Sequence, residues 1–203
     1  EPSTTTRDAL RSATFWWLSS AFSLATVVSV AVSVHLVPYL SDGGYSAGFA
    51  ATAGGAIGVV ALPGRLIFTP LGTRWPRHWV TAAIFLFQAL ALLSLLRVPG
   101  TLGVWLFVIL FGLGFGAITP ARAALVAETY GPKHYGSITG VLTMAGSGAR
   151  ALAPVGAGLL YAVFLSYGPV LWLLLALSIL AAATVLMARQ GHETGTSPAP
   201  AEL

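Results

Sequence analysis

The sequence predicts an all-α membrane protein with six transmembrane helices, and three observations carry that prediction. Hydrophobic residues make up 56% of the 203-residue chain, charged residues only 8%, and the mean hydropathy is +0.83. A soluble chain of this length needs far more charge to cover its surface. The apolar residues also gather in blocks near the ~20 residues that cross the hydrocarbon core of a bilayer.

Six apolar blocks define the predicted spans, at about residues 14–37, 47–71, 80–96, 102–126, 136–165 and 170–188. Pro38 and the Asp42-Gly43-Gly44 stretch are expected to end the first span, and Pro70, Gly72 and Pro76 the second, because proline interrupts the helical hydrogen bonds. Glu128 is expected in the loop after the fourth span. Pro154 is expected to kink the fifth, which is also long enough to tilt.

The membrane bundle is predicted to occupy residues 13–189. Residues 1–12 are polar and lack the apolar core of a signal peptide, so we interpret them as a cytoplasmic linker that follows an earlier segment. Residues 190–203 are interpreted as a disordered cytoplasmic tail. The chain has no cysteine, which excludes a disulfide framework and a thiolate metal site. No metal cluster and no cofactor are predicted.

The basic residues outside the spans fall almost entirely on one side of the predicted bundle. If successive spans cross the membrane in alternating directions, six basic residues fall on one side: Arg7, Arg11, Arg74, Arg77, Lys133 and Arg189. The other side receives Arg97 together with Asp42. By the positive-inside rule both termini are cytoplasmic, in a multi-pass protein of the plasma or inner cell membrane. The basic residues are scattered singly between apolar blocks, so membrane topology explains the pI near 9.9 better than a nucleic-acid-binding patch does. The lipid bilayer is therefore an expected partner, and nucleic acid is not.

Glycine divides the predicted spans into two kinds. The second, fourth and fifth are rich in glycine, which lets helices approach closely, whereas the third and sixth contain none and are expected to face lipid. If inner spans are those that pack against other helices and outer spans those that face lipid, the order inner, inner, outer therefore occurs twice along the chain. Two spans also share a local pattern: Gly64-Arg65 with Pro70 and Gly72, against Ala149-Arg150 with Pro154 and Gly156. Together these features predict a three-plus-three inverted repeat of the kind that transporters use.

Three motifs are specific in combination: Gly64-Arg65-Leu66 followed by Pro70-Leu71-Gly72-Thr73-Arg74-Trp75-Pro76-Arg77, Gly112-x-Gly114-x-Gly116 with Pro120 and Ala127-Glu128-x-x-Gly131, and Ala153-Pro154-x-Gly156-x-Gly158. In these residues the chain resembles the C-terminal six-helix half of a major facilitator superfamily transporter. The resemblance implies half of a major facilitator fold, alternating access by symport or antiport, and an N-terminal six-helix half as partner. It implies gating or structural roles for Gly72, Arg74, Arg77, Glu128 and Pro154. Thr73 stands where the loop signature usually has an acid, which removes that acid from any gating salt bridge.

A second resemblance is to one branch of that superfamily. His35-Leu36-Val37-Pro38 before a glycine turn, with Arg65 in the next helix, is similar to the monocarboxylate and oxalate–formate transporters. In that branch an arginine at the position of Arg65, and a basic residue in the helix of Arg150, are implicated in binding carboxylates. The resemblance therefore implies a small organic anion as substrate.

Arg150 is the strongest candidate for a substrate-binding residue. It lies about fourteen residues into the fifth predicted span, which at ~1.5 Å per residue is near the bilayer midplane. An arginine there costs at least about 2.5 kcal/mol, so it should face a wet cavity or a partner. Asp42 and Glu128 lie too far away along the membrane normal. The counter-charge is then carbonyls, water, the other half or an anionic substrate; alternatively, Arg150 is structural and bonds helix carbonyls at Pro154.

Four other polar residues lie in or near the predicted spans, and two of them have both a functional and a structural interpretation. Arg65 either binds substrate or extends its guanidinium to the cytoplasmic interface. His35 is the third predicted substrate-binding residue, after Arg150 and Arg65. It either packs between helices or acts as a proton-sensitive gate, because histidine titrates near neutral pH. Arg122 is interpreted as a helix cap or a loose partner of Glu128. Gln88 is expected to form a hydrogen bond between helices.

Two other functions also fit a six-span chain. One is a self-contained substrate-binding subunit, such as the vitamin-binding subunit of a larger importer. The other is an intramembrane serine protease, because Gly44-Tyr45-Ser46-Ala47-Gly48 matches the G-x-S-x-G nucleophile pattern. That chemistry needs a histidine beside the serine, and only His35 lies on the same side. The alternative is a turn in which Ser46 caps the second span, and we expect no enzyme activity.

Overall fold

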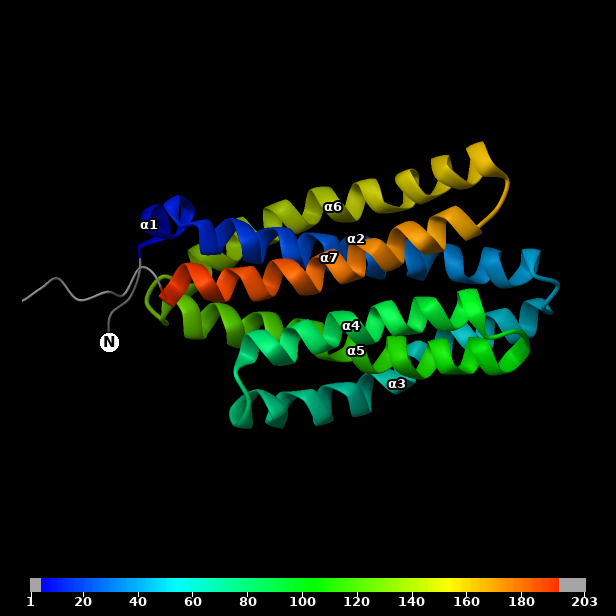
Figure 1. The fold of residues 1–203 in the computed structure, drawn as a ribbon, viewed down its shortest axis with the longest axis horizontal. Helices are drawn as coiled ribbons and strands as arrows, with labels where there is room; N and C mark the ends of the chain where they lie inside the picture. Colours follow the sequence, from blue (N-terminus) through cyan, green and yellow to red (C-terminus); the bar gives the residue numbers. More distant parts are fainter. Residues whose placement is uncertain (1–4, 194–203) are drawn as a thin grey trace, which may run out of the picture.

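The computed structural model describes residues 5–193, and this part of the chain is helical throughout, without a strand (Figure 1). Its helices are α1 Thr6–Arg11, α2 Ala13–Asp42, α3 Ala47–Arg74, α4 Arg77–Arg97, α5 Gly100–Tyr130, α6 Tyr135–Phe164 and α7 Gly168–Glu193. Six of them, α2 to α7, are long and apolar enough to cross a membrane. The predicted fold class of six membrane helices is therefore confirmed.

The helices pack in a pattern that is unchanged when α2, α3 and α4 are exchanged with α5, α6 and α7. In this exchange α2 corresponds to α5, α3 to α6 and α4 to α7. Helices α3 and α4 both pack on α5, and their counterparts α6 and α7 both pack on α2. Helices α4 and α7 pack against each other. Because corresponding helices are three positions apart in the order of spans, and successive spans alternate in direction, the two triplets run in opposite directions through the bundle (Figure 1). This exchange is the three-plus-three inverted repeat that the sequence predicts.

The helices are longer than the sequence predicts, because they continue through their prolines. Helix α2 passes Pro38 and ends at Asp42, and α3 passes Pro70 and Gly72. Glu128, predicted in a loop, lies in the last turn of α5. The predicted interruptions at Pro38, Pro70 and Gly72 and the predicted loop position of Glu128 are therefore wrong. The helices do end at the Asp42-Gly43-Gly44 stretch and just before Pro76, as predicted. In an apolar solvent, ending a helix exposes several unpaired backbone groups, whereas proline removes only one hydrogen bond.

The two terminal segments also contain helix. Residues 1–12, interpreted as a linker, include α1, whose first turn is capped by the Thr5 hydroxyl accepting from the Asp8 backbone N–H. Trp16 of α2 donates its indole hydrogen to the Leu10 carbonyl, which holds α1 against the bundle. At the other end, α7 continues to Glu193, so the predicted tail from residue 190 begins inside a helix. Residues 194–203 lie outside the described part of the chain.

The glycines of α3 and α5 allow these two helices to approach at their backbones. A Cβ atom on Gly64 would overlap the Leu113 carbonyl oxygen, and one on Gly116 would overlap the Ala61 carbonyl oxygen. The glycines of α6 differ: a Cβ on Gly140 or on several others in that helix would meet no described atom within 4 Å. Glycine content therefore marks a tight crossing between α3 and α5 but an open face on α6.

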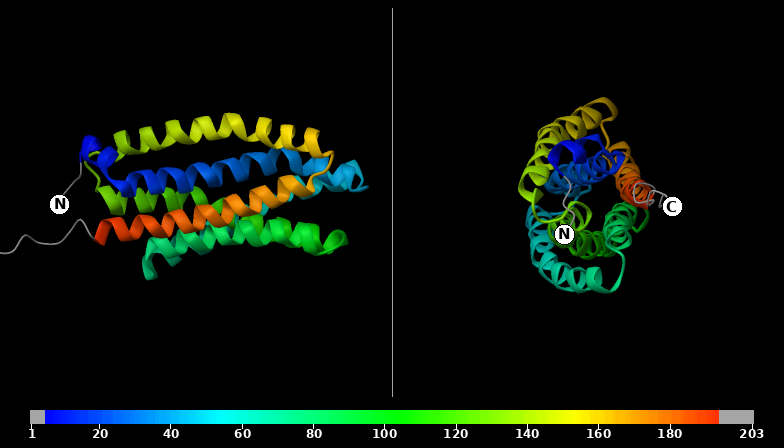
Figure 2. Two further views of the ribbon diagram at one scale, coloured as in Figure 1. Left: turned by 45° about the horizontal axis from the view of Figure 1, so that its top comes forward. Right: turned by 90° about the vertical axis from the view of Figure 1, so that its left-hand side faces the viewer.

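Helices α3 and α6 lie at opposite flanks of the bundle and are its most exposed membrane helices (Figure 2). Their exposed apolar side chains include Val59, Leu62, Leu66, Leu152, Val155 and Leu159. Helices α4 and α7, which contain no glycine within their predicted spans, bury about half of their most apolar segments against each other and against α5 and α2. They are closely packed on this inner side as well as available to lipid outside.

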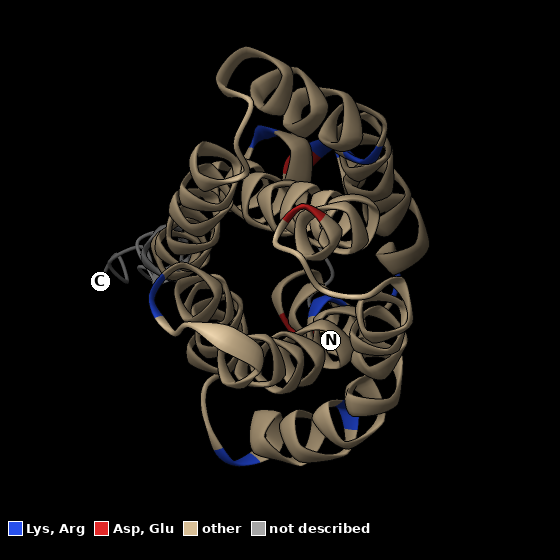
Figure 3. Ribbon diagram, turned by 90° about the vertical axis from the view of Figure 1, so that its right-hand side faces the viewer, with Lys and Arg blue, Asp and Glu red and all other residues tan. Residues whose placement is uncertain are grey.

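Charged positions are few and scattered over the bundle (Figure 3). One end of the bundle, which we call the basic end, holds α1, the link from α3 to α4 and the link from α5 to α6 (Figure 1). Arg74, Arg77 and Lys133 lie at this end, whereas Arg97 and Asp42 lie at the opposite end. The positive-inside rule predicts that the basic end faces the cytoplasm.

Cysteine labelling tests this orientation, because the natural chain contains no cysteine. Ser41→Cys and Ser166→Cys, at the opposite end, should react with a membrane-impermeant maleimide in intact cells. Thr73→Cys and Lys133→Cys, at the basic end, should react only after permeabilisation. The reverse pattern would show that the basic end faces outward.

Candidate functional site

A cavity of about 570 Å³ lies between the membrane helices α2, α3, α5 and α6. Three arginines from three different helices line it: Arg65 of α3, Arg122 of α5 and Arg150 of α6. Neither α4 nor α7 contributes a lining residue, and no acidic side chain is among the lining residues. Of the predicted substrate residues, the structure thus brings Arg65 and Arg150 together. We call this space the arginine cavity.

The position of Arg65 follows from a proline on the neighbouring helix. Pro120 of α5 has no N–H, so the carbonyl of Gly116, four residues earlier, lacks its helical hydrogen-bond donor. The Nε of Arg65 donates to this carbonyl oxygen at 3.4 Å. Gly116 also lacks a side chain, which lets α3 come close enough for that contact. Arg65 therefore has a structural bond through Nε, while its terminal nitrogens make no further bond within the described residues.

Arg150 and Arg122 have no such bond. Neither guanidinium forms a hydrogen bond or an ion pair with any residue in the described part of the chain. The alternative in which Arg150 bonds helix carbonyls at Pro154 is therefore not what the structure shows. The prediction that Arg122 pairs with Glu128 is wrong, because Glu128 pairs with Arg77 instead. Both arginines thus keep their donors available to a ligand in the cavity.

Hydroxyl groups of α2 form a second, uncharged wall of the arginine cavity. Thr26, Ser29 and Ser33 are spaced so that they share one face of the helix, and all three line the cavity. Thr26 and Ser33 donate to carbonyls of their own helix. Ser29 instead accepts a hydrogen bond of 3.2 Å from the buried Gln88 amide of α4, which leaves its own hydrogen available. This confirms the predicted interhelical bond of Gln88.

The sequence interpretation missed both Arg122 and this hydroxyl face. The signal was present in the spacing. Phe115, Thr119 and Arg122 follow one another at four and three residues along α5, which places them on one helix face, and all three line the cavity.

His35 lies outside the arginine cavity, at the crossing of α2 and α6. Its Nε2 is 3.2 Å from the Pro154 carbonyl oxygen and its Nδ1 is 3.4 Å from the Tyr167 hydroxyl. A carbonyl only accepts, so Nε2 donates and Nδ1 of the neutral ring accepts from the tyrosine. His35 therefore joins α2 to α6, as its packing interpretation predicts. Of the three predicted substrate-binding residues, the structure brings Arg65 and Arg150 to one cavity and places His35 outside it.

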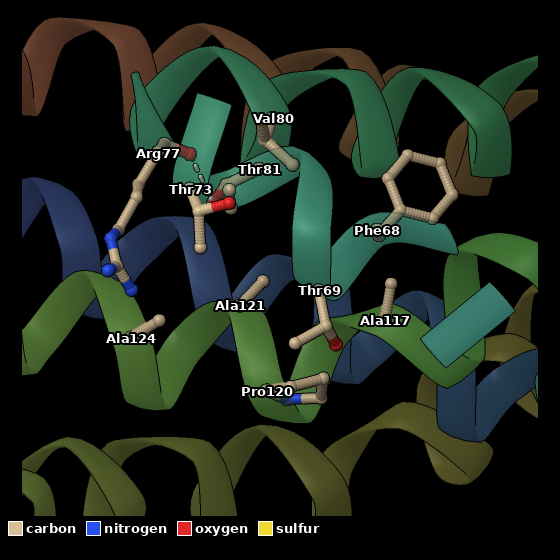
Figure 4. A pocket seen from close by; sticks show the side chains of 11 residues that line it. Phe68, Thr69, Thr73, Arg77, Val80, Thr81, Ala117, Pro120, Ala121 and Ala124 are labelled. Atoms are coloured by element: carbon tan, nitrogen blue, oxygen red, sulfur yellow. Dashed lines mark hydrogen bonds between the residues drawn. The ribbon is translucent and has the colours of Figure 1, made fainter. Parts of the chain in front are cut away.

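The residues predicted to act in gating gather at the basic end. Arg77 at the start of α4 forms an ion pair with Glu128 of α5, and Figure 4 shows its side chain reaching across to α5 near Ala124. A cavity of about 130 Å³ lies beside this pair and includes Gly72 and Thr73 in its wall. The Thr73 hydroxyl, at the position where the loop signature has an acid, donates to the Pro70 carbonyl.

Arg74 and Pro154 are two further positions predicted to have gating or structural roles. Arg74 is exposed in the last turn of α3. Pro154 lies within α6, where its carbonyl is joined to His35.

The serine of the G-x-S-x-G sequence is a helix cap. Ser46 is the N-cap of α3, and its hydroxyl oxygen accepts from the Phe49 backbone N–H at 3.3 Å. His35 is engaged with Pro154 and Tyr167, as described above, and its bonding partners do not include Ser46. This arrangement supports the capping interpretation of the motif.

The charged side chains that line the arginine cavity are all positive. Its three guanidinium groups carry a fixed positive charge, because arginine does not lose its proton in proteins. Among the described acids, Asp42 accepts from Tyr161 at the opposite end, Glu128 pairs with Arg77 at the basic end, and Asp8 of α1 accepts from the Thr5 hydroxyl. No described carboxylate is therefore placed to neutralise the cavity.

Comparison with known proteins agrees with this architecture. A family model of the Major Facilitator Superfamily matches residues 1–154, which is most of the chain and includes Arg65, Arg122 and Arg150. No curated protein matches the chain significantly. The match supports membrane transport in general and does not select the monocarboxylate branch. Six membrane helices, the inverted repeat and this match together show that the chain belongs to the major facilitator superfamily of membrane transporters.

Proposed function

We propose that the chain forms one half of an alternating-access transporter, and that its arginine cavity binds a small organic anion, best fitted by a monocarboxylate. The observation that carries the proposal is the cavity itself, where Arg65, Arg122 and Arg150 converge without a described acid among the lining residues. An uncompensated arginine within a membrane span is costly, at about 2.5 to 3.5 kcal/mol on insertion scales. A bound anion would remove this cost at the moment of binding.

Carboxylate fits the donor groups better than a spherical anion does. The planar guanidinium presents two parallel N–H groups that match the two oxygens of a carboxylate. Arg150 has both terminal nitrogens available, and the Ser29 hydroxyl of α2 has a hydrogen available. The wall also contains Phe115 and Ala61, which suit a short apolar substituent. Arg65 contributes charge while its Nε stays bonded to Gly116.

The exposed faces of α3 and α6 support a second six-helix bundle as partner. These two helices flank the arginine cavity and present apolar side chains such as Leu62 and Leu152 outward. A second bundle packed on these faces would close the cavity on the side that this chain leaves open. Transport would then proceed by rocking the two bundles about the shared site, in a cell membrane with the basic end in the cytoplasm.

Counterflow in proteoliposomes tests both parts of the proposal without assuming a coupling ion. Vesicles preloaded with lactate, and containing the chain together with an N-terminal bundle, should accumulate labelled lactate. Formate and acetate should compete, whereas lactamide, which has the same shape without the charge, should not. Vesicles with this chain alone should show no saturable counterflow.

Two outcomes would contradict the proposal separately. Equal competition by lactamide would show that the site does not depend on the anionic charge. Robust counterflow by the chain alone would show that a second bundle is not required, and would favour a self-contained unit or a dimer of this chain.

A further inference from the structure

A second cavity, of about 290 Å³, lies at the end of the bundle opposite the basic end. Four tyrosines and one aspartate line it, together with small residues of the two adjoining links: Tyr39, Asp42, Tyr45, Tyr161 and Tyr167. It shares no lining residue with the arginine cavity. We call it the tyrosine–aspartate cavity. Its composition is opposite to that of the arginine cavity, since its only charged lining residue is an acid.

Asp42 has no basic partner in the described part of the chain. Its Oδ2 accepts a 2.7 Å hydrogen bond from the Tyr161 hydroxyl, and its Oδ1 has no described partner. Arg97, a cation at the same end, lies instead over the ring of Trp172, 5.5 Å from its centroid. Asp42 is also the last residue of α2, where the helix dipole is negative and a carboxylate is disfavoured. A bound cation would relieve both features.

The tyrosine rings hold one another in place around this carboxylate. Tyr167 is buried between Tyr161, at 4.4 Å between ring centroids, and Tyr39, at 5.8 Å with the rings perpendicular. Tyr45 is held by stacking on Phe49 at 5.0 Å. Burial, and secondarily the charge of Asp42, raise the pKa of Tyr167, so its phenol stays neutral at physiological pH. The cavity wall is therefore a preformed set of aromatic rings.

We propose that the tyrosine–aspartate cavity binds the ammonium group of an organic amine. The negative faces of tyrosine rings attract organic cations, and the Asp42 carboxylate supplies the opposite charge. A metal ion fits less well, because Ca²⁺ and Mg²⁺ take about six or more oxygen ligands and the cavity offers one carboxylate. The volume is about ten times the ~30 Å³ that a water molecule occupies in the liquid, which leaves room for a methylated ammonium group.

Titration with tetramethylammonium chloride tests the proposal on the purified full chain in phosphatidylglycerol nanodiscs, whose lipids carry no ammonium group. Isothermal titration calorimetry at constant ionic strength should show saturable binding, with sodium chloride as the reference titration. Asp42→Asn should weaken the affinity at least tenfold, while its amide oxygen still accepts from Tyr161. Glu128→Gln, which removes the acid at the other end of the bundle, should leave the affinity unchanged. Thermal melts of both variants verify folding.

Repeating the titration in phosphatidylcholine nanodiscs distinguishes a lipid headgroup from a free amine. If the headgroup fills the cavity, the apparent affinity for tetramethylammonium falls in these discs for the natural chain. If the cavity takes a soluble amine, the affinity is the same in both lipids. Absence of saturable binding in phosphatidylglycerol, or equal binding by Asp42→Asn, would overturn the proposal. Neither result bears on the carboxylate counterflow that tests the arginine cavity.

Discussion

Arg150→Gln should raise the KM for carboxylate counterflow by roughly ten- to a hundredfold, with near-normal amounts of protein in the membrane. A hydrogen bond to a charged group contributes about 1.5 to 3 kcal/mol, and each 1.4 kcal/mol changes affinity about tenfold. Glutamine keeps much of the side chain's length and polarity but loses the charge and the guanidinium fork. Since Arg150 bonds no described residue, its removal leaves no protein partner unsatisfied. The measurement is KM normalised to surface protein.

Two further variants separate substrate binding from a structural role. Arg150→Lys keeps the charge without the planar fork, so its KM should lie between those of the natural protein and Arg150→Gln. Arg97→Gln is the matched control, because Arg97 is engaged over Trp172 at the far end of the bundle, and its KM should be unchanged. A structural Arg150 predicts the reverse for Arg150→Gln: low abundance and a low melting temperature, with a normal KM in the surviving molecules.

The arginine cavity illustrates how far sequence reasoning reaches. Arg150 could be selected from the sequence because a charge near the middle of an apolar block is costly wherever the helix lies. Arg122 could not be selected in the same way, since it stands near the end of its block, where a structural interpretation is available. Only the packing of α3 on α5, and of α6 on α2, shows that Arg122 shares a cavity with Arg65 and Arg150.

The fold shows the same division between composition and packing. Apolar blocks and their alternation predict six spans, because the bilayer sets both length and composition. Helix ends at Pro38 and Pro70 were mispredicted, since rules for proline come from chains in water, where a broken helix is solvated. Composition also treats all glycines alike. A Cβ on Gly64 would overlap a backbone carbonyl, whereas a Cβ on Gly140 would meet no described atom within 4 Å. Whether a glycine lies at a tight helix crossing therefore depends on the neighbouring helix.

Gly64→Ala should markedly destabilise the bundle, while Gly58→Ala on the same helix should not. The added Cβ at Gly64 would overlap the carbonyl oxygen of Leu113, which belongs to the α5 backbone and cannot rotate away. Overpacking of this kind costs about 1 to 3 kcal/mol, and more when a whole helix has to shift. A Cβ at Gly58 would meet no described atom within 4 Å, and alanine is the better helix former by about 1 kcal/mol.

Thermal unfolding in detergent, followed by tryptophan fluorescence, compares these two variants directly. Both carry the same chemical change on α3, so helix propensity cancels and the difference in melting temperature isolates the α3–α5 crossing. That crossing also holds the carbonyl of Gly116 beside Arg65, so a displaced α3 would shift one wall of the arginine cavity. Gly64→Ala should therefore raise the KM for carboxylate as well as lower the melting temperature. Equal melting temperatures for Gly64→Ala and Gly58→Ala would show that α3 and α5 do not approach as closely as the structure has them.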